Sequence, residues 1–182
     1  MKYRICLISL IVLLSTLAVS QAAPAPATPS YDKFEVYAGA QYRYAAGVPL
    51  QWDKLGLGFN FAGWEAAGTY KFNPHFGITA DTDGFYNTLN AADLYVGPSV
   101  YLPKGSWTFF AHAMPGFNHL FGAGLGNTGF SIASGGGVDV AMGKKVALRI
   151  AQVDWIWNQN SHGTSNLNQS YLRYSGGLVF KF

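Results

Sequence analysis

The residues best suited to covalent chemistry lie toward the C-terminal end of the chain. Ser161, His162 and Ser165, with Asp154 a few residues before them, offer nucleophiles, a base and a carboxylate that could orient the base. His162 lies in a segment rich in Asn and Ser, and such segments are more often solvated loops than catalytic sites. We therefore expect no catalytic residues and favour a protein that is not an enzyme.

Two other kinds of site can be weighed from motifs. Gly124-Leu125-Gly126-Asn127-Thr128-Gly129 matches the letters G-x-G-x-x-G, but no helix pattern follows it, so we interpret it as a flexible loop. The 4 histidines have no metal-ligand spacing, and the single cysteine, Cys6, lies near the N-terminus. The sequence predicts no metal, nucleotide or other cofactor.

The N-terminal region has the organisation of a secretory signal. Lys2 and Arg4 precede an apolar run from Ile5 to Val19, and small residues end at Ala22. We predict a signal peptide at residues 1–22, an Ala/Pro-rich linker at 23–33 and one domain at 34–182. Loss of Lys2 and Arg4 from the 12 basic residues leaves 10 against 9 acidic ones, which gives no reason to expect nucleic-acid binding.

The composition argues against an ordinary soluble domain. Charged residues make up 12% of the chain and aromatic residues 16%, and there are 22 glycines. Soluble domains average about 25% charged residues. A surface with so few charges would be poorly solvated in water.

Period-2 alternation of apolar and polar residues predicts eight strands after the signal. They are expected at residues 34–44, 61–72, 76–86, 92–102, 107–118, 130–142, 146–157 and 171–182. Tight turns are expected at 73–75, 103–106 and 143–145, and longer connections at 45–60, 87–91, 119–129 and 158–170. Strands of this length and turns that alternate in length are typical of membrane barrels. The predicted fold class is all-β, an eight-stranded antiparallel up-and-down transmembrane β-barrel.

Charged residues share one face of most predicted strands, and apolar residues share the other. Arg or Lys facing lipid near the bilayer midplane costs about 2 to 4 kcal/mol, so Arg149 and Arg173 must point inward. The lumen charge network expected from this rule comprises Glu35, Arg43, Glu65, Lys71, Asp81, Asp93, His112, Asp139, Arg149 and Arg173. Arg149 and Asp154 differ in parity, which predicts either a β-bulge between them or an Asp154 at the aqueous rim. In a lumen this narrow, opposite charges would pair and fill the space.

The last predicted strand ends abruptly on an aromatic residue, with Leu178, Phe180 and Phe182 on one face. Together with the export signal, this strand resembles those of the small eight-stranded outer-membrane β-barrel superfamily, such as the OmpA transmembrane domain and OmpX-like proteins. The resemblance covers residues 34–182 and implies an integral protein of the Gram-negative outer membrane. It also implies periplasmic termini and short turns, extracellular long loops, and an assembly signal at Leu178, Phe180 and Phe182 that the barrel-assembly machinery reads.

The expected role is noncatalytic, either structural in the envelope or in surface interaction, with a lumen plugged by paired charges. Outer-membrane lipids and lipopolysaccharide are the expected partners of a monomer, and the apolar segment 119–129 either folds over the barrel mouth or contacts lipopolysaccharide. A narrow-pore channel is the alternative. A lipid A-modifying enzyme is less favoured, because Thr164 stands where the lipid A deacylases of this superfamily have Ser, two residues after His162. A soluble lipocalin-like barrel is the structural competitor.

Overall fold

The computed structural model describes residues 31–46, 60–85, 90–122, 125–162 and 165–182. The predicted signal peptide at 1–22 and most of the linker at 23–33 lie outside these ranges. In the described part of the chain, no helix is long and apolar enough to cross a membrane.

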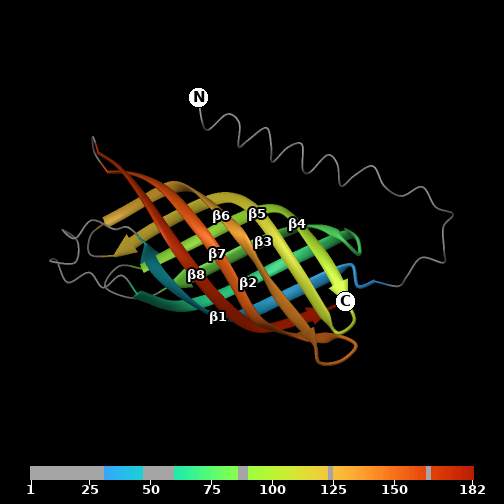
Figure 1. Cartoon of the computed structure of the whole chain (residues 1–182). Coiled ribbons are helices and arrows are strands. Elements are labelled where there is room, and N and C mark those ends of the chain that lie inside the picture. The colour runs from blue at the N-terminus through green and yellow to red at the C-terminus, as the bar shows by residue number, and fades with distance from the viewer. Residues whose placement is uncertain (1–30, 47–59, 86–89, 123–124, 163–164) are drawn as a thin grey trace. The chain divides into compact units, whose positions relative to one another are not determined.

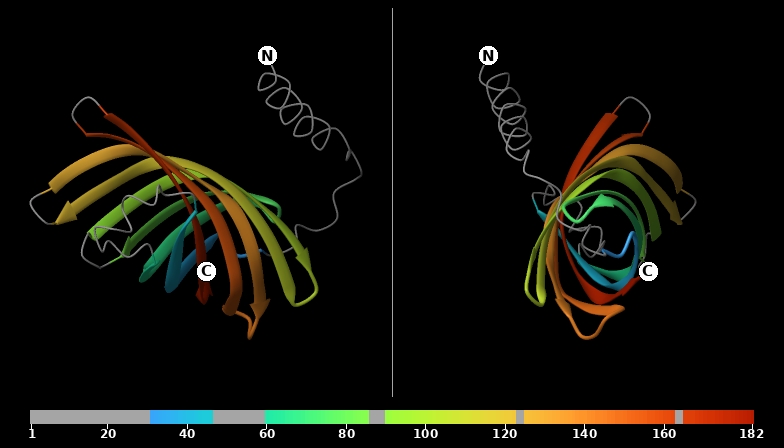
Figure 2. Two further views of the ribbon diagram at one scale, coloured as in Figure 1. Left: turned by 60° about the vertical axis from the view of Figure 1, so that its left-hand side comes forward. Right: turned by 90° about the vertical axis from the view of Figure 1, so that its right-hand side faces the viewer.

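Eight antiparallel strands form a closed barrel in sequence order, as Figures 1 and 2 show. The strands are β1 (Phe34–Ala46), β2 (Asn60–Asn73), β3 (Phe76–Phe85), β4 (Asn90–Lys104), β5 (Trp107–Gly122), β6 (Leu125–Ala141), β7 (Val146–His162) and β8 (Ser165–Lys181). Each strand pairs with its neighbours in the chain, and β8 pairs with β1 to close the wall. The predicted eight-stranded antiparallel barrel is confirmed.

The end of the chain completes this closure. The backbone N–H of Phe182 donates to the carbonyl of Phe34 at 2.8 Å, and the N–H of Phe34 donates back at 3.3 Å. Leu178 and Phe180 pair with Ala38 and Val36 in the register of β8 with β1. The outward-facing Leu178, Phe180 and Phe182 therefore lie on the strand that seals the barrel.

Short turns join the strands at the end of the barrel that holds the C-terminus. In the first, the Asn73 side-chain oxygen accepts hydrogen bonds from the backbone N–H groups of His75 and Phe76, at 2.8 and 2.9 Å. In the second, Gly105 has φ 63°, a left-handed conformation that glycine adopts without strain. The tight turns at 73–75 and 103–106 follow the expected turn chemistry.

Two of the four expected long connections are wrong. β5 and β6 pair as far as Gly122 and Leu125, and β7 and β8 pair as far as His162 and Ser165. Most of segments 119–129 and 158–170 is therefore strand, in two hairpins that project at the end opposite the C-terminus (Figures 1 and 2). Asn, Ser and Gly gave these segments low strand propensity, but backbone pairing continues where no apolar face is needed.

Side chains alternate between the wall's two surfaces along the strands, as β4 shows with its regular succession of buried and exposed residues. β7 contains one exception. Ile150 and Ala151 both face outward, and the register with β6 and β8 shifts at this point. This β-bulge switches the parity of the strand and turns Asp154 inward. The alternative position of Asp154 at the aqueous rim is excluded.

Candidate functional site: the ion-pair network of the lumen

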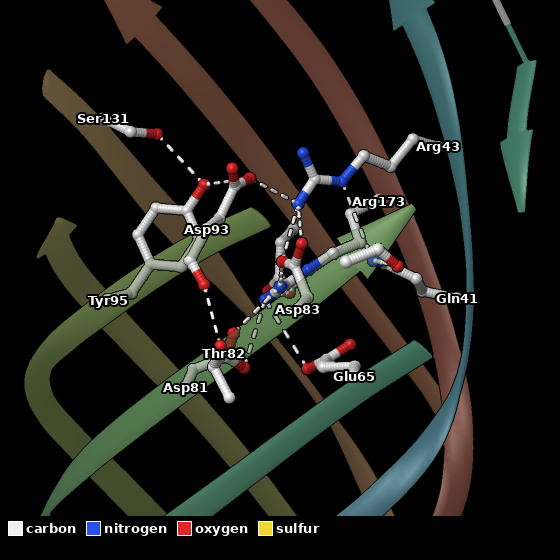
Figure 3. A network of polar contacts seen from close by, with 12 residues as sticks. Gln41, Arg43, Glu65, Asp81, Thr82, Asp83, Asp93, Tyr95, Ser131 and Arg173 are labelled. Carbon is white, nitrogen blue, oxygen red and sulfur yellow. Dashed lines mark hydrogen bonds and ion pairs between the residues drawn. The ribbon is translucent and has the colours of Figure 1, made fainter. Parts of the chain in front are cut away.

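The barrel interior holds a dense set of buried ionisable side chains, here called the lumen network. Its members come from all eight strands and are Glu35, Arg43, Glu65, Lys71, Asp81, Asp83, Asp93, His112, Asp139, Arg149, Asp154 and Arg173. Strand residues two apart share a face, which directs these side chains inward, and the bulge in β7 does the same for Asp154. Figure 3 shows the centre of the network.

Arg173 on β8 is the hub of the network and is completely buried. Its guanidinium lies 3.0 Å from Asp81 and 2.5 Å from Asp83, both on β3. It also lies 2.7 Å from Asp154 on β7 and 3.6 Å from Glu65 on β2. The planar fork of five N–H donors suits this multiple contact, which a lysine could not reproduce. One side chain thus ties together four strands.

Arg43 on β1 extends the network toward the hairpin end. Its Nη2 atom lies 2.5 Å from Asp83 and 2.7 Å from Asp93. Nε donates to the side-chain oxygen of Gln41 at 3.3 Å, and the guanidinium carbon lies 4.8 Å from the centre of the Phe85 ring. Because Asp83 contacts both arginines, the two guanidinium groups form one connected cluster.

A neutral polar layer continues from Asp93 across the lumen. The Tyr95 hydroxyl lies 3.0 Å from both the Asp93 carboxylate and the Ser131 hydroxyl. Asn118 donates to Asp93, and Ser131 donates to Asn158. The path Tyr95–Ser131–Asn158 runs from β4 through β6 to β7, and Asn118 on β5 joins it at Asp93, so charged and neutral groups together span the interior.

The bulge in β7 brings Asp154 into the centre of the network. His112 Nε2 lies 2.7 Å from one of its carboxylate oxygens. Gln152 donates to the other oxygen at 2.7 Å and to Glu65 at 2.9 Å. Asp154 thus links a histidine, an amide and the Arg173 hub.

Arg149 forms a second ion pair closer to the short turns, and its 2.8 Å hydrogen bond to Gln152 connects it to the rest of the network. Its Nε lies 2.8 Å from Asp139 on β6. The guanidinium is held between two aromatic rings, 4.3 Å from the Tyr37 centroid and 4.1 Å from that of Phe110. Cation–π contacts of this kind are stronger when they are desolvated.

Lys71 and Glu35 close the network near the short-turn rim. The Lys71 ammonium lies 2.7 Å from Glu35 and 4.2 Å from the centre of the Tyr101 ring. Lys181 lies 3.7 Å from the same carboxylate. This pair is the outermost layer of the described network at that end.

Apolar side chains fill much of the remaining interior. Tyr37, Ala67, Ala147 and Val179 form one buried cluster, and Tyr95, Met114, Ala133 and Ile156 form another. A cavity of about 10 Å³ borders Glu35, Tyr37, Asp81, His112, Arg149 and Gln152, among others. That volume has room for about one water molecule and for no larger ligand.

All ten residues of the expected charge network have their side chains in the interior, where nine make ion pairs and His112 makes a hydrogen bond to Asp154. The lumen charge network expected from the sequence did not include Asp83 and Asp154, although both lie at the centre of the observed network. Asp83 shares the parity of Asp81, which was a sufficient signal. Asp154 required the position of the bulge, which the sequence left open.

Of the residues considered for catalysis, His162 and Ser165 pair across the β7–β8 hairpin, but Asp154 lies apart from them. Asp154 is buried against His112 and Arg173, so it cannot orient a base at the hairpin tip. His162 lies eight residues further along β7, about 26 Å away at the usual rise of a strand. The side chains of Ser161, His162 and Ser165 lie outside the described residues.

The structure also bears on the glycine-rich motif and on metal binding. Leu125 to Gly129 of the G-x-G-x-x-G match belong to strand β6, which is not the strand-turn-helix context of dinucleotide binding. No group of three or more His, Cys, Asp or Glu side chains that could hold a metal ion occurs among residues 31–182, apart from the four gaps in the described ranges.

The outer surface of the barrel is apolar and aromatic. Exposed large side chains include Phe72, Phe76, Leu94, Leu102, Trp107, Phe117, Ile150, Trp155, Phe180 and Phe182. Such a wall around a polar interior inverts the arrangement of a soluble barrel. It matches a barrel whose solvent is lipid.

Comparison with known proteins supports the same conclusion. No protein-family model and no curated protein matches the sequence. Among solved structures, Neisserial surface protein A is 16% identical, with a TM-score of 0.64 over 84% of this chain and 99% of its own. The N-terminal β-barrel domain of Pseudomonas aeruginosa OprF is 6% identical, with a TM-score of 0.56 over 84% and 100%.

A third structure, the attachment invasion locus protein Ail of Yersinia pestis, is 12% identical, with a TM-score of 0.54 over 84% of this chain and 100% of its own. Identities this low carry information on the fold alone. The chain has the fold of the small eight-stranded outer-membrane β-barrels.

Proposed function

We propose that this protein is a noncatalytic integral outer-membrane barrel whose lumen is closed by the ion-pair network. Its role lies in its outer surface and projecting strands, as a structural component of the envelope or in surface contacts. The observation that supports this most directly is the continuous set of bonds from Arg43 through Asp83 and Arg173 to Asp154 and His112. An ion could pass only if these pairs separated.

The energetics favour a closed lumen. Arg43, Asp83, Asp154 and Arg173 are each 0% exposed, so none of them has water to replace a lost partner. Removing one partner from a buried ion pair costs about 3 to 5 kcal/mol. Thermal fluctuations would therefore rarely break several of these contacts at once.

Conductance across planar lipid bilayers tests the closed lumen. We expect the wild-type barrel to show no steady current. Arg173→Ala should raise conductance, because it removes the side chain that occupies the centre of the lumen. Ile150→Ala, on the outward face, is the control and should leave the bilayer silent. A steady wild-type current would refute closure.

A narrow channel is the second candidate, and the buried charges of the lumen predict the ion selectivity that it would have. Seven buried carboxylates, Glu35, Glu65, Asp81, Asp83, Asp93, Asp139 and Asp154, face four buried bases, Arg43, Lys71, Arg149 and Arg173. An excess of negative charge would favour cations over anions in any open state. The reversal potential under a salt gradient would then reveal cation selectivity.

The proposed topology places both termini and the short turns in the periplasm and the β5–β6 and β7–β8 hairpins outside the cell. The hairpins support it by projecting beyond the apolar wall, as outer-membrane barrels extend their extracellular side. Loss of Cys6 with the signal would leave no native thiol. A membrane-impermeant maleimide added to whole cells should label Gly163→Cys and spare Lys144→Cys. The reverse pattern would invert the topology.

A further inference from the structure

Charges outside the lumen network gather at one end of the barrel. The described residues of this kind are Asp32, Lys33, Lys104, Lys144, Lys145 and Lys181. Five of the six are lysines, and the one acid, Asp32, is paired with Lys145 at 2.7 Å. These five lysines, here called the lysine rim, lie at the short-turn end, where Figure 1 marks the C-terminus.

The hairpin end has no comparable set of charges in its sequence. Segment 45–60 contains one acid, Asp53, and one base, Lys54. Segments 86–91, 119–129 and 158–170 contain no Asp, Glu, Lys or Arg. Basic side chains that could bind lipid phosphates are therefore concentrated at the short-turn end.

Apolar neighbours set the depth of the lysine rim. Leu102, Met142 and Phe182 are large exposed apolar side chains that face outward at the ends of strands. Lys104 and Lys144 follow two residues after the first two, whereas Lys181, next to Phe182, turns to the lumen side, 3.7 Å from the Glu35 carboxylate. Lysines that border an apolar wall extend their ammonium groups to the headgroup layer of a membrane. The lysine rim is thus placed at the height of lipid phosphates.

We propose that the lysine rim binds the headgroups of anionic phospholipids in the leaflet at the short-turn end. The lysines extend over the β4–β5 turn, the β6–β7 turn and the ends of β8 and β1, which is an arc of the circumference. An arc suits a layer of surrounding lipids better than the single contact patch of a folded acidic protein. Lysine, a compact strongly hydrated charge, also suits a mobile lipid layer.

The test measures lipid selectivity of the folded barrel. Protein in phosphatidylcholine bilayers is given trace spin-labelled phosphatidylglycerol or phosphatidylcholine, and electron paramagnetic resonance measures how much label the protein immobilises. We expect about a twofold to fivefold preference for phosphatidylglycerol at low salt. The preference should vanish near about 0.5 M salt, because salt at that concentration screens the attraction between lysine ammonium groups and lipid phosphates.

Variants locate the preference on the barrel. The triple variant Lys104→Gln/Lys144→Gln/Lys145→Gln should reduce the preference ratio of phosphatidylglycerol to phosphatidylcholine toward one. The matched triple Lys→Arg variant should keep the wild-type ratio. Lys54→Gln, in the residues outside the described ranges, should change nothing. Heat-modifiable gel mobility verifies that each variant is folded, and the salt titration of the wild type tests the charge effect without any variant.

Three results would overturn the proposal. A wild-type barrel without lipid preference would leave an acidic protein as the partner of the lysine rim. A Gln variant with the full preference would show that other groups recognise the lipid, and a loss of preference in Lys54→Gln would move the site to the other end. None of these results depends on conductance, so the closed lumen is tested separately.

Discussion

Replacement of Arg173 by Met removes the hub of the lumen network while it keeps most of the side-chain volume. Four carboxylates lose a partner, but they do so unequally. Asp83 keeps Arg43 at 2.5 Å, and Asp154 keeps His112 at 2.7 Å. Among the described residues, Asp81 and Glu65 have ion pairs to Arg173 alone, and Glu65 also accepts a hydrogen bond from Gln152 at 2.9 Å. The substitution therefore leaves two buried carboxylates, Asp81 and Glu65, without a counter-charge, and of the two only Glu65 keeps the hydrogen bond from Gln152.

The expected cost follows from this burial. Asp81 is 2% exposed and Arg173 is 0% exposed, so water does not compensate for the lost pair. Breaking a buried pair from one side costs about 3 to 5 kcal/mol, and we expect the free energy of unfolding to fall by that amount. Adding Asp81→Asn should recover part of the loss, because the neutral amide no longer needs a counter-charge.

Urea unfolding from lipid vesicles, followed by tryptophan fluorescence, measures these changes. Asp32→Asn is the control partner, since Asp32 pairs with Lys145 at 2.7 Å outside the lumen and makes no described ion pair with the lumen network. In the double variant with Arg173→Met, the two changes in the free energy of unfolding should add within about 0.5 kcal/mol. The changes caused by Asp81→Asn and Arg173→Met should not add. A loss below about 1 kcal/mol for Arg173→Met, the level of an exposed pair, would refute the network as a source of stability.

Two further substitutions test the wall and its assembly. Gly135→Ala would place a methyl group within 2.1 Å of the Val153 carbonyl oxygen and 2.2 Å of the Asp154 carboxylate, so denaturation should show a loss of about 1 to 3 kcal/mol. Gly68→Ala, with open space at the same point, should be nearly neutral. Phe182→Ala should lower the amount of barrel in isolated outer membranes but leave refolding in detergent intact. Phe72→Ala, 60% exposed against 64% for Phe182, is the matched control, and equal losses for both would refute an assembly signal.

The sequence was sufficient for the barrel because its physical rules repeat along every strand. Charged residues recur at period two, and the cost of a lipid-facing Arg decides which face is interior. This reasoning placed Arg43, Lys71, Arg149 and Arg173 inside, and the structure has them there. Short turns were equally predictable, since Asn73 and Gly105 supply the hydrogen bonds and dihedral angles that tight turns need.

The parts that could not be predicted lack such a repeat. The outward pair Ile150 and Ala151 lies between the inward-facing Arg149 and Gln152, but an uncharged Gln carries no lipid-facing cost like that of Arg, so the charge rule alone did not fix where the bulge lies. Without that position, Asp154 could not be assigned to the centre of the network. The strand extensions in segments 119–129 and 158–170 were not predicted for a related reason. A strand that has water on both faces does not need to alternate apolar and polar residues, so its sequence lacks the period-2 pattern.

The distribution of basic residue types shows how the barrel separates two tasks. All three arginines of the described chain lie inside, where each meets carboxylates or aromatic rings through a rigid planar group. Lysines dominate the exposed rim, where a single hydrated charge is enough. Lys71 is the exception inside, and it sits in the outermost layer with one close carboxylate, Glu35. The lumen network and the lysine rim share one described ion pair, between Lys181 and Glu35. Neutralising the lysine rim should therefore alter lipid selectivity without raising conductance. Removing Arg173 should lower the free energy of unfolding without changing lipid selectivity.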